Sequence, residues 1–95
     1  MFETRRSDEG TIEFIGRLDA SQAEKARGVL AAVLETCTID MGGLEYISSM
    51  GLSVLLETQK RLSEGGHGLR LVRLNKRIED LFRVAGFDTI FEIEK

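Results

Sequence analysis

Two adjacent serines, Ser48 and Ser49, stand where a short apolar segment gives way to a helical pattern. A hydroxyl at such a junction is exposed and lies near the free N–H groups of the first helical turn. Phosphorylation there adds a charge of about −1.5 to −2 without disturbing a core. The same hydroxyls also suit helix capping, because serine is a preferred N-cap residue. Capping is the more frequent role for this local pattern, so both interpretations stay open.

The other reactive side chains give little support to catalysis. Cys37 is the only cysteine and His67 the only histidine, too few for an intrachain disulfide or the usual metal site. The segment around Cys37 is typical of a buried strand, where a thiol serves as a small core residue. His67 lies in a glycine-rich turn with nothing to orient it as a base. We therefore expect a protein that is not an enzyme and that uses no cofactor or metal.

Composition and charge narrow the kind of protein that this chain can be. The 95 residues suffice for one domain, residues 1–95. A formal net charge of −3 argues against nucleic-acid binding, which needs a clustered basic surface. No apolar run approaches the roughly 20 residues of a membrane span, so we expect no direct membrane insertion. The first residues lack the apolar core of a signal peptide, which favours a cytoplasmic location.

The hydrophobic pattern alternates between strands and helices. Residues 2–5 and 11–17 read as a hairpin, and Ser21 with Glu24 fits a capping box that opens a helix. The expected apolar face of that helix is Ala23, Ala26, Leu30, Val33 and Leu34. The later elements are a strand at 37–41, a helix at 51–64, a strand at 69–74, a helix opened by Asn75 and stopped by Gly86, and a short edge strand or helical turn within 87–93. Helices between strands predict an α/β fold with parallel pairing of the middle strands.

Three stretches in this order resemble one family. They are residues 16–21 (GRLDAS), residues 39–52 (IDMGGLEYISSMGL), and an ending formed by residues 73–75, 81–82 and 86–91. Together they are similar to the STAS domain of bacterial anti-sigma factor antagonists, over nearly the whole chain. The resemblance implies a mixed sheet of four to five strands with helices packed mainly on one face.

The resemblance also implies a function in regulation. Such antagonists bind an anti-sigma factor that is also a serine kinase; phosphorylation of the antagonist reverses the binding, and a phosphatase resets it. We expect the free protein to be a monomer. The alternative is a constitutive STAS scaffold or a subunit of a lipid-transport ABC assembly that is not regulated by phosphorylation.

The family's usual form, Asp-Ser-Ser/Thr-Gly-Leu, aligns on Gly51 and Leu52. This register makes Ser49 the predicted phosphorylation site and Ser48 the second choice, and it puts Ser48 where the family usually has aspartate. Asp19 matches an acidic loop position close to the acceptor. The residues expected to contact the partner are Asp19, Ser21, Tyr46, Ser48, Ser49, Met50 and Gly51.

Overall fold

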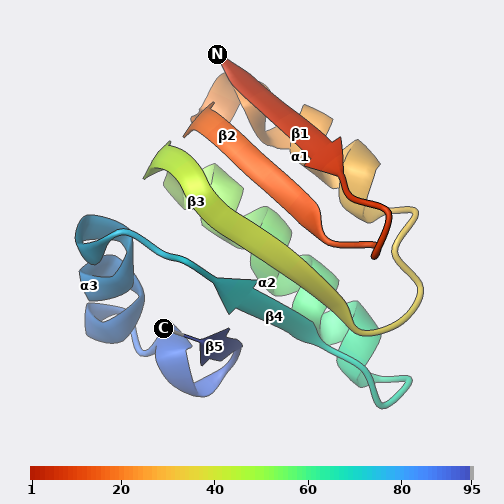
Figure 1. Cartoon of the computed structure of the whole chain (residues 1–95). Coiled ribbons are helices and arrows are strands. Elements are labelled where there is room, and N and C mark those ends of the chain that lie inside the picture. Colours follow the sequence, from red (N-terminus) through yellow and green to blue (C-terminus); the bar gives the residue numbers. More distant parts are fainter. Residues whose placement is uncertain (95) are drawn as a thin grey trace.

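The computed structural model describes residues 1–94, which form one five-stranded sheet and three α-helices (Figure 1). The strands are β1 (Phe2–Arg6), β2 (Ile12–Leu18), β3 (Cys37–Ile47), β4 (Leu69–Val72) and β5 (Glu92–Glu94). The helices are α1 (Ala23–Leu30), α2 (Ser49–Ser63) and α3 (Lys76–Val84), with two 3₁₀ turns, η1 (Ala20–Gln22) and η2 (Phe87–Thr89). The predicted α/β fold with a mixed sheet is confirmed.

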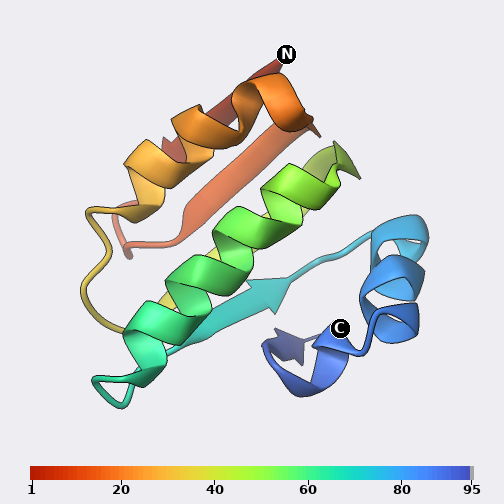
Figure 2. The same ribbon diagram turned by 180° about the vertical axis from the view of Figure 1, so that it is seen from behind.

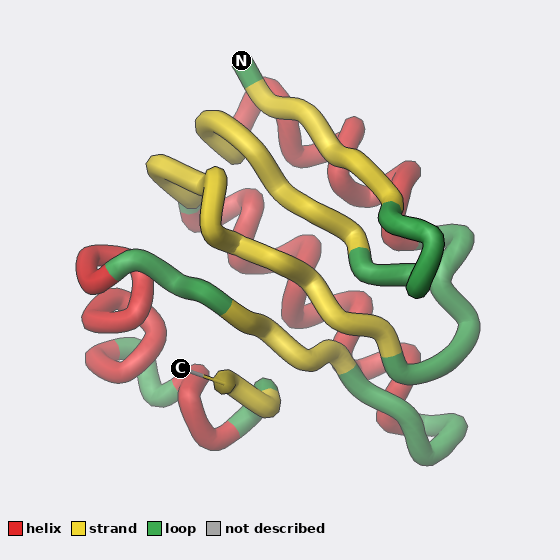
Figure 3. Tube along the Cα trace, in the orientation of Figure 1, coloured by secondary structure: helices red, strands yellow, loops and turns green. Residues whose placement is uncertain are grey.

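The strands follow one another across the sheet in chain order, β1-β2-β3-β4-β5 (Figure 3). The pair β1–β2 is the antiparallel hairpin predicted from the sequence, and the remaining three pairs are parallel. At the carboxyl ends of β2 and β3, Leu18 lies opposite Ile47. Because parallel strands end on the same side of a sheet, the segments that follow β2 and β3 meet at one edge.

Helices α1 and α2 cover the same face of the sheet, as predicted, while α3 lies beside the end of β4 (Figure 2). Alternate strand residues point toward this helical layer, so Phe14, Ile39 and Leu71 are fully buried. Phe2 packs edge-on against Phe14, with ring centroids 5.1 Å apart. The hydrophobic core therefore lies between the sheet and the helices. It includes Leu18 and Ile47, the last residues of β2 and β3.

Strand β3 is longer than the sequence pattern predicted. It continues through Gly42 and Gly43 to Ile47, whereas the expected strand stopped at position 41. Gly43 pairs with Ile15, and Gly42 leaves room for the side chain of Arg73, the residue after β4: a Cβ at Gly42 would lie 2.2 Å from its Nη2. The two glycines look like a turn signal in sequence, but neighbouring strands hold them in the sheet.

Helix α1 is shorter than predicted. It ends at Leu30, and Leu34, assigned to its apolar face, is 77% exposed. Ala23, Ala26 and Leu30 are buried as expected, and Val33 is buried from the connecting loop. The guanidinium of Arg61 donates hydrogen bonds to the carbonyls of Leu30 and Val33, both at 2.8 Å. These bonds satisfy the end of α1 in place of further helical turns.

Helix α3 begins at the predicted cap, Asn75. Its Oδ1 accepts a hydrogen bond from the N–H of Ile78 (2.9 Å), and its Nδ2 donates to the carbonyl of Leu44 in β3 (3.0 Å). One side chain thus both starts the helix and ties it to the sheet.

Replacing that cap tests both bonds. We expect Asn75→Ala to lower the free energy of unfolding by about 1–2 kcal/mol, measured by urea denaturation, because a cap and a bond to a strand carbonyl are lost together. Asn75→Asp is the matched control, since aspartate still caps the helix but has no amide donor for Leu44. It should lose less than the alanine variant. Equal losses would show that the cap contributes nothing.

Candidate functional site

The loops after β2 and β3 form one continuous rim, here defined as residues 17–21 and 46–51. The N–H of Ser48 donates to the carbonyl of Leu18 at 2.9 Å, so one backbone hydrogen bond joins the two loops directly. This places the predicted residues Asp19 and Ser21 on the same edge as the serine pair, as the shared direction of β2 and β3 requires. The rim is the structural setting for the predicted site.

Ser48 caps helix α2. Its backbone is extended (φ −89°, ψ 171°), and its Oγ accepts a hydrogen bond from the N–H of Gly51 at 3.1 Å. That geometry is the standard N-cap arrangement, in which a side-chain oxygen satisfies a free N–H three residues on. The hydroxyl of Ser48 is therefore engaged, and its residue is half-buried.

Ser49 is the first residue of α2, and it is exposed. The two serines thus divide the roles that the sequence left open, with the cap at Ser48 and the accessible hydroxyl at Ser49. A helix N-terminus carries partial positive charge and free N–H groups, so an anion at Ser49 meets a favourable field. We therefore expect a phosphate at this position to leave the first turn of α2 folded.

Asp19 is held by Ser21 at the other side of the rim. Its Oδ1 accepts hydrogen bonds from the hydroxyl of Ser21 (2.6 Å) and from the N–H of Ser21 (3.1 Å). The predicted capping box at Ser21 and Glu24 is wrong: Asp19 caps η1, and α1 starts at Ala23 after an N-cap, Gln22, that makes no side-chain bond. Asp19 instead accepts the N–H of Ser21, as an aspartate at an N-cap does, and the Ser21 hydroxyl donates to the same carboxylate.

The Ser21 hydroxyl is the main reason that the pKa of Asp19 lies below its ordinary value. Because the pKa of Asp19 is lowered in the folded state, its ionised carboxylate stabilises the fold at pH values above the ordinary aspartate pKa. This stabilisation is lost as the pH falls through the lowered pKa. We expect Ser21→Ala to raise the pKa of Asp19, as followed by an NMR titration of the Asp19 carboxyl carbon. An unchanged Asp19 titration would contradict the assignment.

Tyr46 and Met50 supply apolar surface to the rim, with 37% and 47% of each residue exposed. Gly51 was expected to contact the partner, but it is buried. A Cβ at this position would lie 2.8 Å from Cγ of Leu18 and 2.9 Å from Cγ1 of Ile47. Gly51 thus allows the first turn of α2 to approach the ends of β2 and β3, and it positions the rim from beneath.

Arg17 belongs to the rim although the sequence analysis did not select it. It lies beside Tyr46 in the β2–β3 register, and its guanidinium carbon stands 4.5 Å from the centre of the Tyr46 ring. This is a cation–π contact at an exposed site. Its only sequence signal was a position two residues before Asp19; the strand register that brings it to Tyr46 is a tertiary property.

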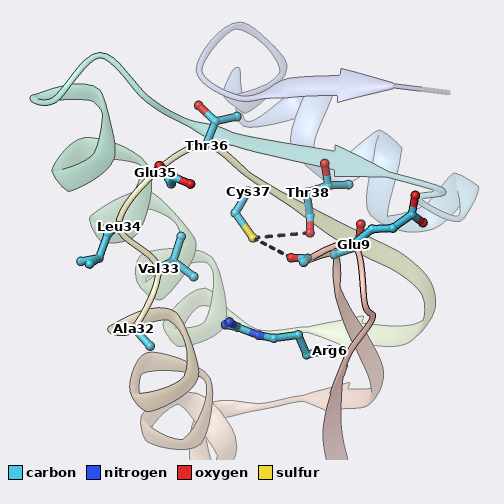
Figure 4. A pocket seen from close by; sticks show the side chains of 11 residues that line it. Arg6, Glu9, Ala32, Val33, Leu34, Glu35, Thr36, Cys37 and Thr38 are labelled. Carbon is cyan, nitrogen blue, oxygen red and sulfur yellow. Dashed lines mark hydrogen bonds between the residues drawn. The ribbon is translucent and has the colours of Figure 1, made fainter.

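A separate hollow of about 490 Å³ lies at the opposite end of β2 and β3, around Cys37 (Figure 4). Cys37 is only partly buried, so the prediction of a core residue is wrong in part. Its Sγ lies 3.6 Å from the carbonyl of Gly10, and burial raises the pKa of the thiol. A thiol that stays protonated is a poor nucleophile, and none of the residues that line this hollow belongs to the rim.

Two further structural findings concern metal sites and membrane-spanning helices. Within residues 1–94, no group of three histidine, cysteine or acidic side chains could hold a metal ion. Over the same residues, no helix is both long and apolar enough to cross a membrane.

The sequence profile of the family described as "Mlab, STAS domain" matches residues 1–93. This chain belongs to the STAS domain family. BtrV of Bordetella bronchiseptica, whose assignment as an anti-sigma factor antagonist is itself provisional, is 33% identical over 82 residues, which cover 82% of this chain and 71% of BtrV. The resemblance noted in the sequence is thereby confirmed.

Solved structures agree with the fold of this STAS domain. A protein from Thermotoga maritima that is provisionally assigned as an anti-sigma factor antagonist has a TM-score of 0.82 at 22% identity. The match covers 100% of this chain and 86% of that one. The anti-sigma factor antagonist SpoIIAA gives 0.73 at 15% identity unphosphorylated, with 100% and 88% covered. Its phosphorylated form, from Bacillus, gives 0.72 at 16% identity, with 100% and 92% covered. At these identities the structures bear on the fold alone.

Proposed function

We propose that this STAS domain is an anti-sigma factor antagonist whose binding is switched off by phosphorylation of Ser49. It acts as a binding protein in the cytoplasm and not as an enzyme. Its partner is an anti-sigma factor with serine kinase activity, and a phosphatase restores the unmodified form. The observation that carries the proposal is the exposed hydroxyl of Ser49 on the first turn of α2, left free because Ser48 makes the cap.

The surroundings of Ser49 support a docking surface at the rim. Tyr46 and Met50 expose apolar side chains at the rim, and Asp19 adds a carboxylate that accepts a hydrogen bond from the Ser21 hydroxyl. A mixed apolar and polar surface around a modifiable hydroxyl suits a partner that binds and then phosphorylates the same place. A phosphate there places two negative charges in a closed interface, which costs desolvation and any like-charge repulsion.

The relatives bear on the choice of partner. BtrV is described as an anti-sigma factor antagonist, and SpoIIAA is an antagonist solved in unphosphorylated and phosphorylated forms. We carry the partner class to this chain from these relatives. They do not favour the alternative of a constitutive scaffold or a transporter subunit.

The test uses the full chain, its cognate anti-sigma kinase and ATP. After incubation, mass spectrometry maps the phosphate, and titration calorimetry compares binding of the modified and unmodified chains. We expect one phosphate on Ser49, none on the Ser49→Ala variant, and weaker binding after modification. An unmodified Ser49 together with no measurable binding would remove the switching proposal. Recovery of a transporter ATPase in a pull-down would instead favour the scaffold role.

A further inference from the structure

A backbone irregularity lies in β2 directly before Arg17. Gly16 has a φ of +96°, and the β2–β3 register shifts between Gly16 and Arg17. A Cβ at Gly16 would lie 2.2 Å from the carbonyl oxygen of Met1, and the N–H of Arg17 donates to that same oxygen at 2.8 Å. Only glycine fits both this φ and this close approach. Such bulges commonly redirect a side chain at the rim of a sheet, here the side chain of Arg17.

Arg17 is charged, exposed and free to bind an anion. Among residues 1–94, it forms no ion pair, whereas Arg70 in β4 and Arg73 directly after that strand pair with carboxylates. Its contact is instead with the uncharged face of the Tyr46 ring. An exposed cation–π contact is weaker than the paired hydrogen bonds that a guanidinium makes with a phosphate.

The acceptor serine lies near the same strand ends. Arg17 is adjacent to Tyr46 across the β2–β3 pair, and Tyr46 precedes Ser49 by three residues. The hydrogen bond from Ser48 to Leu18 fixes the chain between them. A long arginine side chain at the end of β2 and a phosphate on the first turn of α2 therefore share one edge of the sheet.

We propose that Arg17 is the residue that receives the phosphate on Ser49, exchanging its contact with the Tyr46 ring for an ion pair with the phosphoserine. The inference rests on the proposed function, and it names the residue that converts the modification into a change of surface. In the unmodified protein, the rim presents Arg17 stacked on Tyr46. In the modified protein, the guanidinium moves to the phosphate and the Tyr46 ring is left uncovered, so two features that a partner meets at the rim change together.

The test separates this inference from the action of any kinase. Phosphoserine is incorporated at position 49 during translation, so the modified chain exists whether or not a kinase recognises it. A ³¹P NMR titration then measures the second pKa of the phosphate, ordinarily about 6. We expect Arg17→Gln to raise this pKa by about 0.5 or more, because a nearby cation favours the dianion. Arg17→Lys should keep part of the effect.

Arg5→Gln is the matched control. Arg5 lies on β1 opposite Glu13, near the start of β2, whereas Arg17 lies near the end of β2. Its substitution removes the same charge far from Ser49. It should leave the phosphate pKa unchanged. A shift equal to that of Arg17→Gln would mean that only net charge matters, and no shift in either variant would also overturn the proposal. Urea denaturation of each variant confirms that it is folded.

A second readout follows Arg17 directly. Tyr46 is the only tyrosine and the chain has no tryptophan, so tyrosine fluorescence reports on this ring alone. Phosphoserine at position 49 should change the Tyr46 emission in the wild-type background and leave it unchanged in the Arg17→Gln background. Equal changes in both backgrounds would show that Arg17 does not move. A kinase that ignores Ser49 would refute the proposed function while leaving both of these measurements interpretable.

Discussion

The Gly51→Ala variant is expected to unfold more easily than the wild type, by about 1–2 kcal/mol in urea denaturation. Alanine normally stabilises a helix relative to glycine, but here its methyl group has no room. The Cβ would lie under 3.0 Å from both Leu18 and Ile47, whose side chains are buried and cannot move aside freely. Overpacking of this kind typically costs about 1–3 kcal/mol, which exceeds the gain in helix propensity.

Gly28→Ala is the control for this prediction. Gly28 lies inside α1, and a Cβ there would meet nothing within 4 Å. The same substitution should therefore raise stability by about 0.5–1 kcal/mol. Opposite signs for the two glycines would show that the space above Leu18 and Ile47, and not helix propensity, decides the result at position 51. A stabilised Gly51→Ala variant would contradict the packing argument.

The Gly51→Ala variant also tests how the rim is positioned. To make room for the methyl group, the first turn of α2 must move away from the ends of β2 and β3. Ser49 lies in that turn, so the rate at which a kinase modifies it should fall along with stability. Gly28→Ala, which lies far from the rim, should leave that rate unchanged.

Local signals in the sequence predicted the serine junction and several helix ends correctly. Ser48 and Asn75 cap their helices because a cap needs only a short polar side chain followed by a helical pattern. Gly86 ends α3 with a φ of +79°, a conformation that glycine adopts without strain. These features depend on residues within a few positions of one another, so a single sequence is enough to find them.

The features that the sequence did not reveal depend on contacts between distant segments. The cation–π contact of Arg17 with Tyr46 follows from the strand register, and the bulge at Gly16 follows from the carbonyl of Met1. Leu34 continues the helical spacing of α1 but lies outside the helix, because Arg61 satisfies the carbonyls where α1 ends. Hydrophobic periodicity cannot report such competing partners.

The second large effect concerns the modification itself. Phosphoserine at position 49 is expected to weaken binding to the anti-sigma partner by roughly a hundredfold, about 3 kcal/mol, in titration calorimetry. The free energy of unfolding should stay within about 0.5 kcal/mol of the unmodified value, because the anion lies at the amino end of α2, where the helix field favours it. A loss of stability as large as the loss of binding would mean that the phosphate unfolds the rim instead of blocking an interface.

Variants at Ser48 separate the cap from the acceptor. Ser48→Ala should lower stability by about 1 kcal/mol, because the N–H of Gly51 loses its partner, yet Ser49 should still be modified. Ser48→Asp should keep the stability, since aspartate caps as well as serine. Ser49→Ala should show the reverse pattern, with stability intact and no phosphate accepted. If Ser48→Ala were to abolish modification while the protein remained folded, the phosphate would belong on Ser48, and the capping serine would itself be the switch.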